Sequence, residues 1–370
     1  MKTGYYNIEP NVSELGSINF FYNGSKIEEN GYRGISHLVE HLICKAIDHI
    51  DEELISHGLK FNASTSENIV HFYLTGMNKH IKKFENEFIK ILNYIPTKEE
   101  FYKEKLIVLA EYNNLFSKPN CIFQNISRKY FNRFGAIGYS TDIENITYEQ
   151  YLEFQNNHFS KPLSIIRVGE TEFSNYYKNL IYTKDIEKIY DYLDVGNEFL
   201  EYNCSTNNPL NVHWCNCNIK PIYQEFISLY LSNGLNSPLY QELREKNGLV
   251  YYVQSDILFD NLNSSPIVIL YECQKKNSKQ CQKLIRSMFK NFETNENRFD
   301  NMKKYIECTY EESEIFNHNT KYVKNFIEDV DYLNVYRELN FEKFSEMMNE
   351  FSETFLREEK LTIAGKEMKI

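Results

Sequence analysis

Apolar residues in the first half of this chain fall into short runs of strand length and longer stretches with helical spacing. Their order is strand, helix, strand, two helices, a further helix that begins after Thr147, and a short apolar strand that ends in glycine. Thr147 suits the N-cap of that helix, because a hydroxyl there accepts a hydrogen bond from the first turn. The predicted strands cover residues 17–22, 61–74 and 163–169, and two of the predicted helices cover residues 81–92 and 98–116.

The second half of the chain repeats this order more loosely. Its predicted helices cover residues 223–232, 280–289 and 340–353, and its predicted strands cover residues 250–258, 266–271 and 361–365. Both halves close with a helix, a short apolar strand and a glycine. The pattern predicts an α+β fold of two related domains, each an antiparallel-rich sheet with helices packed on it. The predicted domains are residues 1–190 and 191–370, joined in the acidic stretch around residues 185–203.

Composition and charge limit the classes of function. With 370 residues, of which 42% are hydrophobic, the chain can form two domains with sizeable cores. The formal net charge of -11 and the lack of a dense basic patch argue against a nucleic-acid partner. No apolar run reaches the length of a signal peptide or of a membrane span. The 8 scattered cysteines favour free thiols in a reducing cytoplasm over a disulfide framework.

The segment from His37 to His41, with the sequence HLVEH, carries the strongest chemical signal. The two histidines are four residues apart, so on a helix they share a face and can point at one ion. Glu40 lies on the same side, within reach of a water molecule at that ion. This is the inverted zinc-peptidase motif, H-x-x-E-H. By itself, the spacing is equally compatible with a solvent-exposed helix face.

Two carboxylates, Glu104 and Glu111, lie seven residues apart in the predicted helix over residues 98–116 and project from one face of it. Thr97 and Glu100 form a capping box that fixes the start of this helix. Catalytic zinc usually has three protein ligands and one open position, so a carboxylate here can complete the set. Salt-bridged glutamates on an amphipathic helix are the alternative interpretation.

These residues together resemble the pitrilysin family of zinc metallopeptidases, the inverzincins, which includes insulin-degrading enzyme and the mitochondrial processing peptidase. In that family H-x-x-E-H is followed by two glutamates seven residues apart on another helix. The resemblance implies one Zn²⁺ per chain, bound by His37, His41 and Glu111, with Glu104 supporting the ligands. The stretch from His41 to Glu111 is a few residues shorter here than is usual in the family.

The segment from Gly58 to Ser66 resembles the G-x-x-x-N-A-x-T strand of the same family, which runs along the active cleft. The resemblance implies that Asn62, Ala63 and Ser64 form an edge to which a peptide substrate adds as a further strand. Main-chain hydrogen bonds then provide affinity and side-chain pockets provide selectivity. Without the zinc motif, an ordinary strand after a glycine turn would be the simpler interpretation.

A segment of the second half, residues 237–251, resembles the family's S-x-L-x-x-x-L-R-E-x-x-G-L-x-Y sequence. Arg244 and Tyr251 match the arginine and the tyrosine that reach the substrate at the zinc in that family. A guanidinium and a phenol hydroxyl can bind the scissile carbonyl and the oxyanion that develops from it. The alternatives are a solvated charge run and the start of a core strand.

The resemblance implies a zinc-dependent endopeptidase that cleaves small or unfolded peptides in a closed chamber, or trims a precursor or leader peptide. Glu40 would act as the general base on a water molecule whose pKa zinc lowers towards roughly 7. The alternative is a non-catalytic binding or structural subunit of a heteromeric complex of this family.

The family resemblance also implies how the chain assembles. A chain of this size corresponds to half of the four-domain clamshell of the longer family members, so two chains are needed to close a chamber. The resemblance implies a homodimer, or a heterodimer with a related subunit, in which the second domain of one subunit faces the zinc site of the other.

Overall fold

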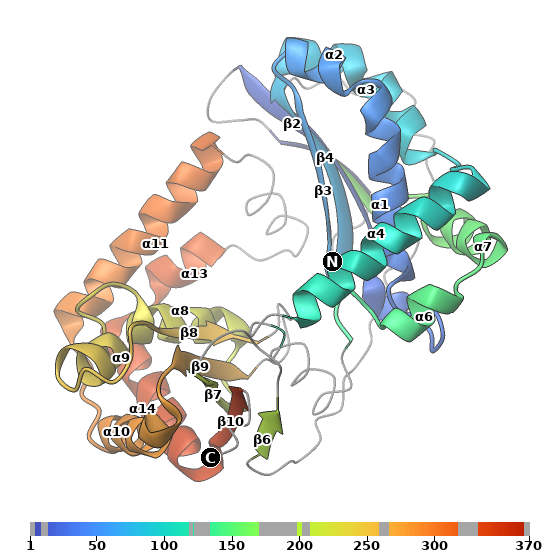
Figure 1. Cartoon of the computed structure of the whole chain (residues 1–370). Helices are drawn as coiled ribbons and strands as arrows, with labels where there is room; N and C mark the ends of the chain where they lie inside the picture. The colour runs from blue at the N-terminus through green and yellow to red at the C-terminus, as the bar shows by residue number, and fades with distance from the viewer. Residues whose placement is uncertain are drawn as a thin grey trace. The chain divides into compact units, whose positions relative to one another are not determined.

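The computed structural model of the chain describes residues 4–8, 14–117, 121, 134–169, 198–201, 208–258, 266–316 and 332–365 (Figure 1). These residues divide into two compact units. The first unit holds the described residues up to Asn114, from 134 to 169 and from Thr309 to 316. The second unit holds residues 115–117 and 121, those from 198 to Cys308 and those from Tyr332 to 365. The predicted boundary between residues 190 and 191 lies outside the described residues.

A five-stranded sheet forms the frame of the first unit. Its strands lie in the order β1 (Gly4–Ile8), β5 (Ser164–Val168), β2 (Leu15–Asn23), β4 (Ile69–Met77) and β3 (Lys60–Thr65). β1 and β5 are parallel, and the remaining pairs are antiparallel. The central strand β2 is buried from its second residue to its last, whereas burial alternates along β3 at the sheet edge. This alternation is expected where only one face of a strand is covered.

The single strand predicted over residues 61–74 is wrong, because this segment is a hairpin of β3 and β4. The backbone N–H of Ser66 donates to the carbonyl of Ile69 at 2.8 Å, and the Ser66 hydroxyl accepts from the Ile69 N–H at 3.1 Å. Ser66 therefore reverses the chain with its own side chain, as serine often does at turns.

The helices of the first unit lie on one side of its sheet (Figure 1). They are α1 (Ile35–Lys45), α2 (Asp51–Ser56), α3 (Asn78–Leu92), α4 (Lys98–Phe116), α6 (Ser140–Asn145) and α7 (Tyr148–His158), with short 3₁₀ turns at Ser25–Ile27 and Ala46–His49. The core between helices and sheet includes Leu38 of α1, Phe72 of β4 and Phe88 of α3. The capping box predicted at Thr97, which starts α4, is confirmed. The N-cap predicted at Thr147, which starts α7, is also confirmed, and Thr147 forms a capping box with Gln150.

The second unit has a sheet of the same topology, in the order β6 (Glu198–Glu201), β10 (Lys360–Gly365), β7 (Leu210–Cys215), β9 (Ile267–Glu272) and β8 (Val253–Ile257). Its first pair is again parallel and the others are antiparallel. The predicted pair of related α+β domains is therefore confirmed, and the order of elements repeats along the chain.

Among the described residues, the second unit contains four whole helices of at least seven residues and the part of α11 up to Cys308. They are α8 (Pro221–Ser232), α10 (Ser278–Lys290), α11 (Glu296–Phe316), α13 (Tyr332–Glu338) and α14 (Phe341–Glu358). Our sequence prediction missed α11 because charged and polar residues dominate its sequence. The signal was present in the helical spacing of Phe299, Met302 and Ile306, which are buried.

Among the described residues, no helix combines the length and the apolar character needed to cross a bilayer.

Candidate metal centre

The helix that carries the H-x-x-E-H motif, α1, is held at its start by a buried carboxylate. Gly34 adopts a left-handed backbone with φ of 102° immediately before the helix. The two carboxylate oxygens of Glu28 accept the backbone N–H groups of Gly34 at 2.6 Å and Ser36 at 2.8 Å. These are N–H groups that a helix start leaves without intrahelical partners. Leu38 and Leu42 bury the opposite face, so the motif residues project away from the core.

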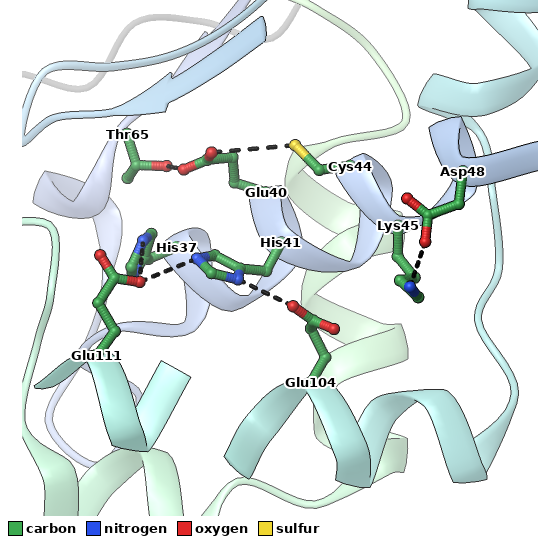
Figure 2. A network of polar contacts seen from close by, with 9 residues as sticks. All are labelled: His37, Glu40, His41, Cys44, Lys45, Asp48, Thr65, Glu104 and Glu111. Atoms are coloured by element: carbon green, nitrogen blue, oxygen red, sulfur yellow. Dashed lines mark hydrogen bonds and ion pairs between the residues drawn. The ribbon is translucent and has the colours of Figure 1, made fainter. Parts of the chain in front are cut away.

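The structure brings the three predicted zinc ligands together (Figure 2). Oε2 of Glu111, on α4, lies 3.3 Å from Nε2 of His41 and 3.8 Å from Nε2 of His37. One ligand atom from each residue lies within 4.8 Å of the other two. Ligand atoms about 2.0–2.1 Å from a tetrahedral zinc lie roughly 3.3–3.4 Å apart, so small side-chain movements fit this set to the metal.

The two histidines differ in how readily they hold a proton. Burial, together with the neighbouring His41, lowers the pKa of His37 to about 3, so its imidazole stays neutral and keeps a lone pair. Burial also acts to lower the pKa of His41, but the hydrogen bond to Glu104 and the charges of Glu40 and Glu111 outweigh it and raise that pKa. A divalent cation bound to His41 would take the place of the proton that the raised pKa favours.

Glu104 supports His41 in the manner that the family resemblance implies. Its Oε1 lies 3.0 Å from Nδ1 of His41, and its side chain is buried. A proton on Nδ1 that donates to this carboxylate leaves the Nε2 lone pair directed at Glu111. Carboxylates behind a metal-binding histidine fix its tautomer and ring orientation in this way. Nδ1 of His37 is buried and has no hydrogen-bond partner among the described residues, so His37 lacks an equivalent support.

Glu40 lies beside the ligand set without being part of it (Figure 2). Its Oε2 accepts a hydrogen bond of 2.7 Å from the hydroxyl of Thr65, at the end of β3. Its Oε1 faces the thiol of Cys44 at 4.0 Å. Burial raises the pKa of Glu40 and Glu111 adds to this, while Thr65 and His41 oppose it. One carboxylate oxygen is thus fixed and the other remains able to take a proton.

The sheet edge next to Glu40 is β3, the last strand in the sheet order. Ladder hydrogen bonds alternate along an antiparallel strand, and the pairing of Ser66 with Ile69 sets their phase. The main chains of Asn62 and Ser64 therefore bond to β4, and those of Phe61, Ala63 and Thr65 face outward. Of the three predicted edge residues, only Ala63 presents its main chain to an added strand, and its N–H currently donates to Oδ1 of Asn62 at 2.9 Å.

Arg244 and Tyr251 lie against one another in the second unit. Arg244 belongs to a π-helical turn, η5 (Gln241–Glu245), and its guanidinium lies 4.9 Å from the ring centroid of Tyr251 and 4.7 Å from that of Tyr240. Tyr251 is 80% exposed, so its hydroxyl is available to a ligand. The structure thus forms two groups of predicted residues, the metal cluster with Glu40 in one unit and the Arg244–Tyr251 pair in the other.

Two models of known protein families match the sequence of this chain. The sequence profile of insulinase, peptidase family M16, matches residues 20–141. That of the peptidase M16 inactive domain matches residues 222–305. The chain belongs to peptidase family M16, the insulinase or pitrilysin family. The two matches fall in the first and the second unit, so each half of the repeat corresponds to one type of M16 domain.

Solved structures of M16 proteins share the fold over the whole chain. A protease from Helicobacter pylori has 17% sequence identity and a TM-score of 0.81, over 99% of this chain and 98% of its own. A peptidase M16 inactive domain from Pseudomonas fluorescens has 16% identity and a TM-score of 0.76, over 99% and 96%. The periplasmic protease PqqL of Escherichia coli, with 10% identity and a TM-score of 0.72, matches 98% of this chain with only 46% of its own. No curated protein matches the sequence. The M16 fold of this chain therefore corresponds to half of a clamshell.

Two residues of the site were not identified from the sequence. Thr65 occupies the threonine position of the family strand motif, and that position was the available signal. Glu28 precedes the helix start by several residues, and no local pattern marks it as the cap, because a loop brings it back to the helix.

Proposed function

We propose that this M16 protein is a zinc-dependent endopeptidase that cleaves small or unfolded peptides. The observation that carries the proposal is the cluster of His37, His41 and Glu111, whose ligand atoms lie within 4.8 Å of one another, with Glu40 beside them. The donors are two imidazole nitrogens and a carboxylate oxygen, a set that zinc prefers in catalytic sites.

Glu40 is the general base in this proposal. Zinc, when held by the cluster, supplies a Lewis acid that polarises the scissile carbonyl and favours ionisation of water. Because Thr65 occupies Oε2 of Glu40, we assign Oε1 to the proton transfer. Oε1 takes the proton of the attacking water and then delivers it to the nitrogen of the leaving amine.

The peptide is proposed to bind along β3. An extended substrate would pair with the outward main-chain groups of Phe61, Ala63 and Thr65. Its end would then lie beside Glu40, because the Thr65 hydroxyl donates to the Glu40 carboxylate. Such pairing uses main-chain hydrogen bonds and requires an extended substrate. It therefore favours short or unfolded peptides, including leader segments, over folded proteins.

Arg244 and Tyr251 are proposed to bind the oxyanion of the transition state. Their side chains already lie together, and a guanidinium with a phenol hydroxyl suits a developing negative charge. Because the chain corresponds to half of a clamshell, we propose that they act on the zinc site of a partner subunit, in a homodimer or in a heterodimer with a related chain. We also propose that the protein works in a reducing cytoplasm, which the scattered cysteines of the chain support.

The test combines metal analysis with mass spectrometry of cleavage products from a peptide mixture. The wild type should bind about one zinc per chain and cleave, and a chelator should abolish cleavage. Glu40→Gln should keep the zinc but lose nearly all activity, since an amide cannot accept the proton. His41→Ala and Glu111→Gln should lose both. Glu99→Gln, a change of an exposed glutamate at the start of α4, is the matched control and should behave as the wild type.

Two outcomes would contradict the proposal. Cleavage by Glu40→Gln at the wild-type rate would remove Glu40 as the base. A wild type that is fully loaded with zinc and cleaves no peptide, alone or with candidate partners, would instead favour a non-catalytic binding subunit.

A further inference from the structure

Helix α4 exposes an isoleucine, Ile107, beside the metal cluster of the first unit. Successive residues turn by about 100° around a helix axis, so Glu104 and Glu111 point in directions only about 20° apart. Val108 lies on one side of this direction and is fully buried in the core. Ile107 lies on the other side, about 40° beyond Glu111, and is 46% exposed. Ile107 therefore borders the cluster on the side that opens to solvent.

The contacts of the two glutamates show where this face of α4 is directed. Glu104 and Glu111 approach the two ring nitrogens of His41 at 3.0 and 3.3 Å, so the face that carries them is turned towards the cluster (Figure 2). Ile107 is three residues after Glu104 and four before Glu111, spacings at which Cβ atoms on a helix are about 5–6 Å apart. The side chain of Ile107 is thus a direct neighbour of both glutamates.

The proposed path of the substrate brings a peptide side chain to this place. Glu40 and Thr65 flank His41 on one side, and α4 flanks it on the other (Figure 2). A peptide that extends the sheet directs alternate side chains to the two faces of that sheet. The helices of the first unit lie on one of these faces (Figure 1), so every second side chain of the peptide points towards α1 and α4. Next to the scissile bond, such a side chain meets α4 at Ile107.

The chemistry of Ile107 differs from that of the cluster. The cluster consists of imidazoles and carboxylates, whereas Ile107 offers only carbon atoms. Its β-branched side chain has few rotamers, so it presents a constant surface. A bulky apolar substrate side chain that covers this surface removes both from water. A small side chain would leave the surface wet, and a charged one would lose hydration against it.

We propose that Ile107 is a specificity-determining residue, which packs against the substrate side chain next to the scissile bond and selects a bulky apolar one over a small or charged one. This role rests on the proposed peptidase function. Exposed apolar residues are common on protein surfaces, and α4 supplies a comparison for this reason. Leu106 is 67% exposed but points about 140° away from Glu111 around the helix.

Binding of peptide hydroxamates to the zinc-loaded protein tests Ile107 without any cleavage, because the hydroxamate group itself binds zinc. Two series of compounds place a variable residue, either leucine, alanine or lysine, before or after this group. Isothermal titration calorimetry gives the Kd of each compound for the full-length wild type, Ile107→Ala, Ile107→Glu and the control Leu106→Glu. Metal analysis confirms that all four proteins carry the same amount of zinc.

In one of the two series, the wild type should bind the leucine compound about tenfold more tightly than the alanine compound, since a few buried methylene groups are worth at least this factor. Ile107→Ala should remove most of this preference. Ile107→Glu should weaken binding of the leucine compound about tenfold and should bind the lysine compound more tightly than the wild type does, because opposite charges then meet. Leu106→Glu adds the same charge to the same helix and should keep the wild-type preference.

A preference for leucine over alanine that stays at the wild-type value in both Ile107 variants, in both series, would overturn the proposal, whatever the protein cleaves. Equal losses of preference in Leu106→Glu and Ile107→Glu would also overturn it, since the position on the helix would then be irrelevant. A preference that depends on Ile107 in a protein that cleaves no peptide would support the role of Ile107 in binding and count against the peptidase activity. The two proposals therefore fail on different measurements.

Discussion

At the scale of single residues, the two carboxylate oxygens of Glu40 have different surroundings and different proposed roles. Its Oε2 is held by the Thr65 hydroxyl at 2.7 Å, while its Oε1 has only the distant contact with the Cys44 thiol among the contacts given above. A base that is fixed through one oxygen presents the other in a constant direction. Thr65 is therefore a positioning residue in the proposed reaction, and it also links the substrate edge to the base.

Replacing Thr65 by valine removes the hydroxyl and keeps the shape of the side chain. We expect kcat to fall about tenfold, the worth of one hydrogen bond to a charged group, with KM and zinc content nearly unchanged. Steady-state kinetics on a fluorogenic peptide, alongside metal analysis, separates these quantities. Thr65→Ser, which keeps a hydroxyl, should recover most of the activity.

The matched control is Thr75→Val on the neighbouring strand β4, where the hydroxyl makes a 3.4 Å contact with the Lys60 carbonyl far from the base. It should leave kcat unchanged. Equal losses in both variants would mean that a general weakening of the β3–β4 hairpin, and not the contact to Glu40, causes the effect.

At the scale of elements, a buried glutamate joins three elements of the second unit. Glu359 ends α14 and precedes β10, and it accepts hydrogen bonds from Gln282 and Arg286 of α10 and contacts His213 of β7. Burial acts to raise the pKa of Glu359, but the hydrogen bonds from these partners outweigh it and lower that pKa below 4.5. The ionised form is thus the one that holds the elements together.

A lowered pKa gives this contact a definite pH dependence. The contribution to stability is fully present above the unfolded-state pKa and is lost as the pH falls through the lower pKa of the folded state. We expect Glu359→Gln to be less stable than the wild type by about 1–3 kcal/mol at pH 7 and the difference to shrink below a pH of about 4.5.

Urea unfolding followed by tryptophan fluorescence measures this directly, because the single tryptophan of the chain, Trp214, is buried on β7 next to His213. The signal therefore reports the second unit alone. The exposed Glu358→Gln serves as the control. A difference between wild type and Glu359→Gln that stays constant from pH 7 to pH 3 would show that its ionisation does not contribute.

At the scale of the whole molecule, the two units share one topology but carry different chemistry. The order β1-β5-β2-β4-β3 corresponds strand by strand to β6-β10-β7-β9-β8, and only the first unit holds the metal cluster among the described residues. The second unit instead supplies Arg244 and Tyr251. A chain of this kind has both halves of the proposed site, which allows a homodimer to form two equivalent composite sites.

Complementation between two inactive variants tests this arrangement. Glu40→Gln and Arg244→Ala, each nearly inactive alone, are mixed under conditions in which subunits exchange. Random pairing makes half of the dimers mixed, and each mixed dimer has one intact site, so activity should recover to about a quarter of the wild type. Absence of recovery, with exchange demonstrated by mass spectrometry of tagged chains, would mean that the arginine serves the zinc of its own chain.

The sequence alone predicted most of the local elements and the residues of the candidate metal cluster. The capping box at Thr97 and the N-cap at Thr147 predicted two helix starts, because a cap depends only on residues up to three positions apart. The pairing of His37 with His41 and of Glu104 with Glu111 followed from helical spacing, and the repeated order of elements predicted two related domains. The sequence prediction missed the polar helix α11, where the apolar spacing is weak. It also missed the turn at Ser66, where no glycine or proline marks the end of a strand.

The tertiary structure decided which of these residues meet. Helix α1 and helix α4 are far apart in the sequence, so only their packing brings Glu111 to 3.3 Å from His41 and Glu104 to its other nitrogen. Packing also brings the Thr65 hydroxyl to Glu40 and the Glu28 carboxylate to the start of α1. In the second unit it brings the Asn211 amide to the sulfur of Cys273. Contacts between distant segments depend on how whole sheets and helices pack, and a periodicity of two or 3.6 residues carries no information about that packing.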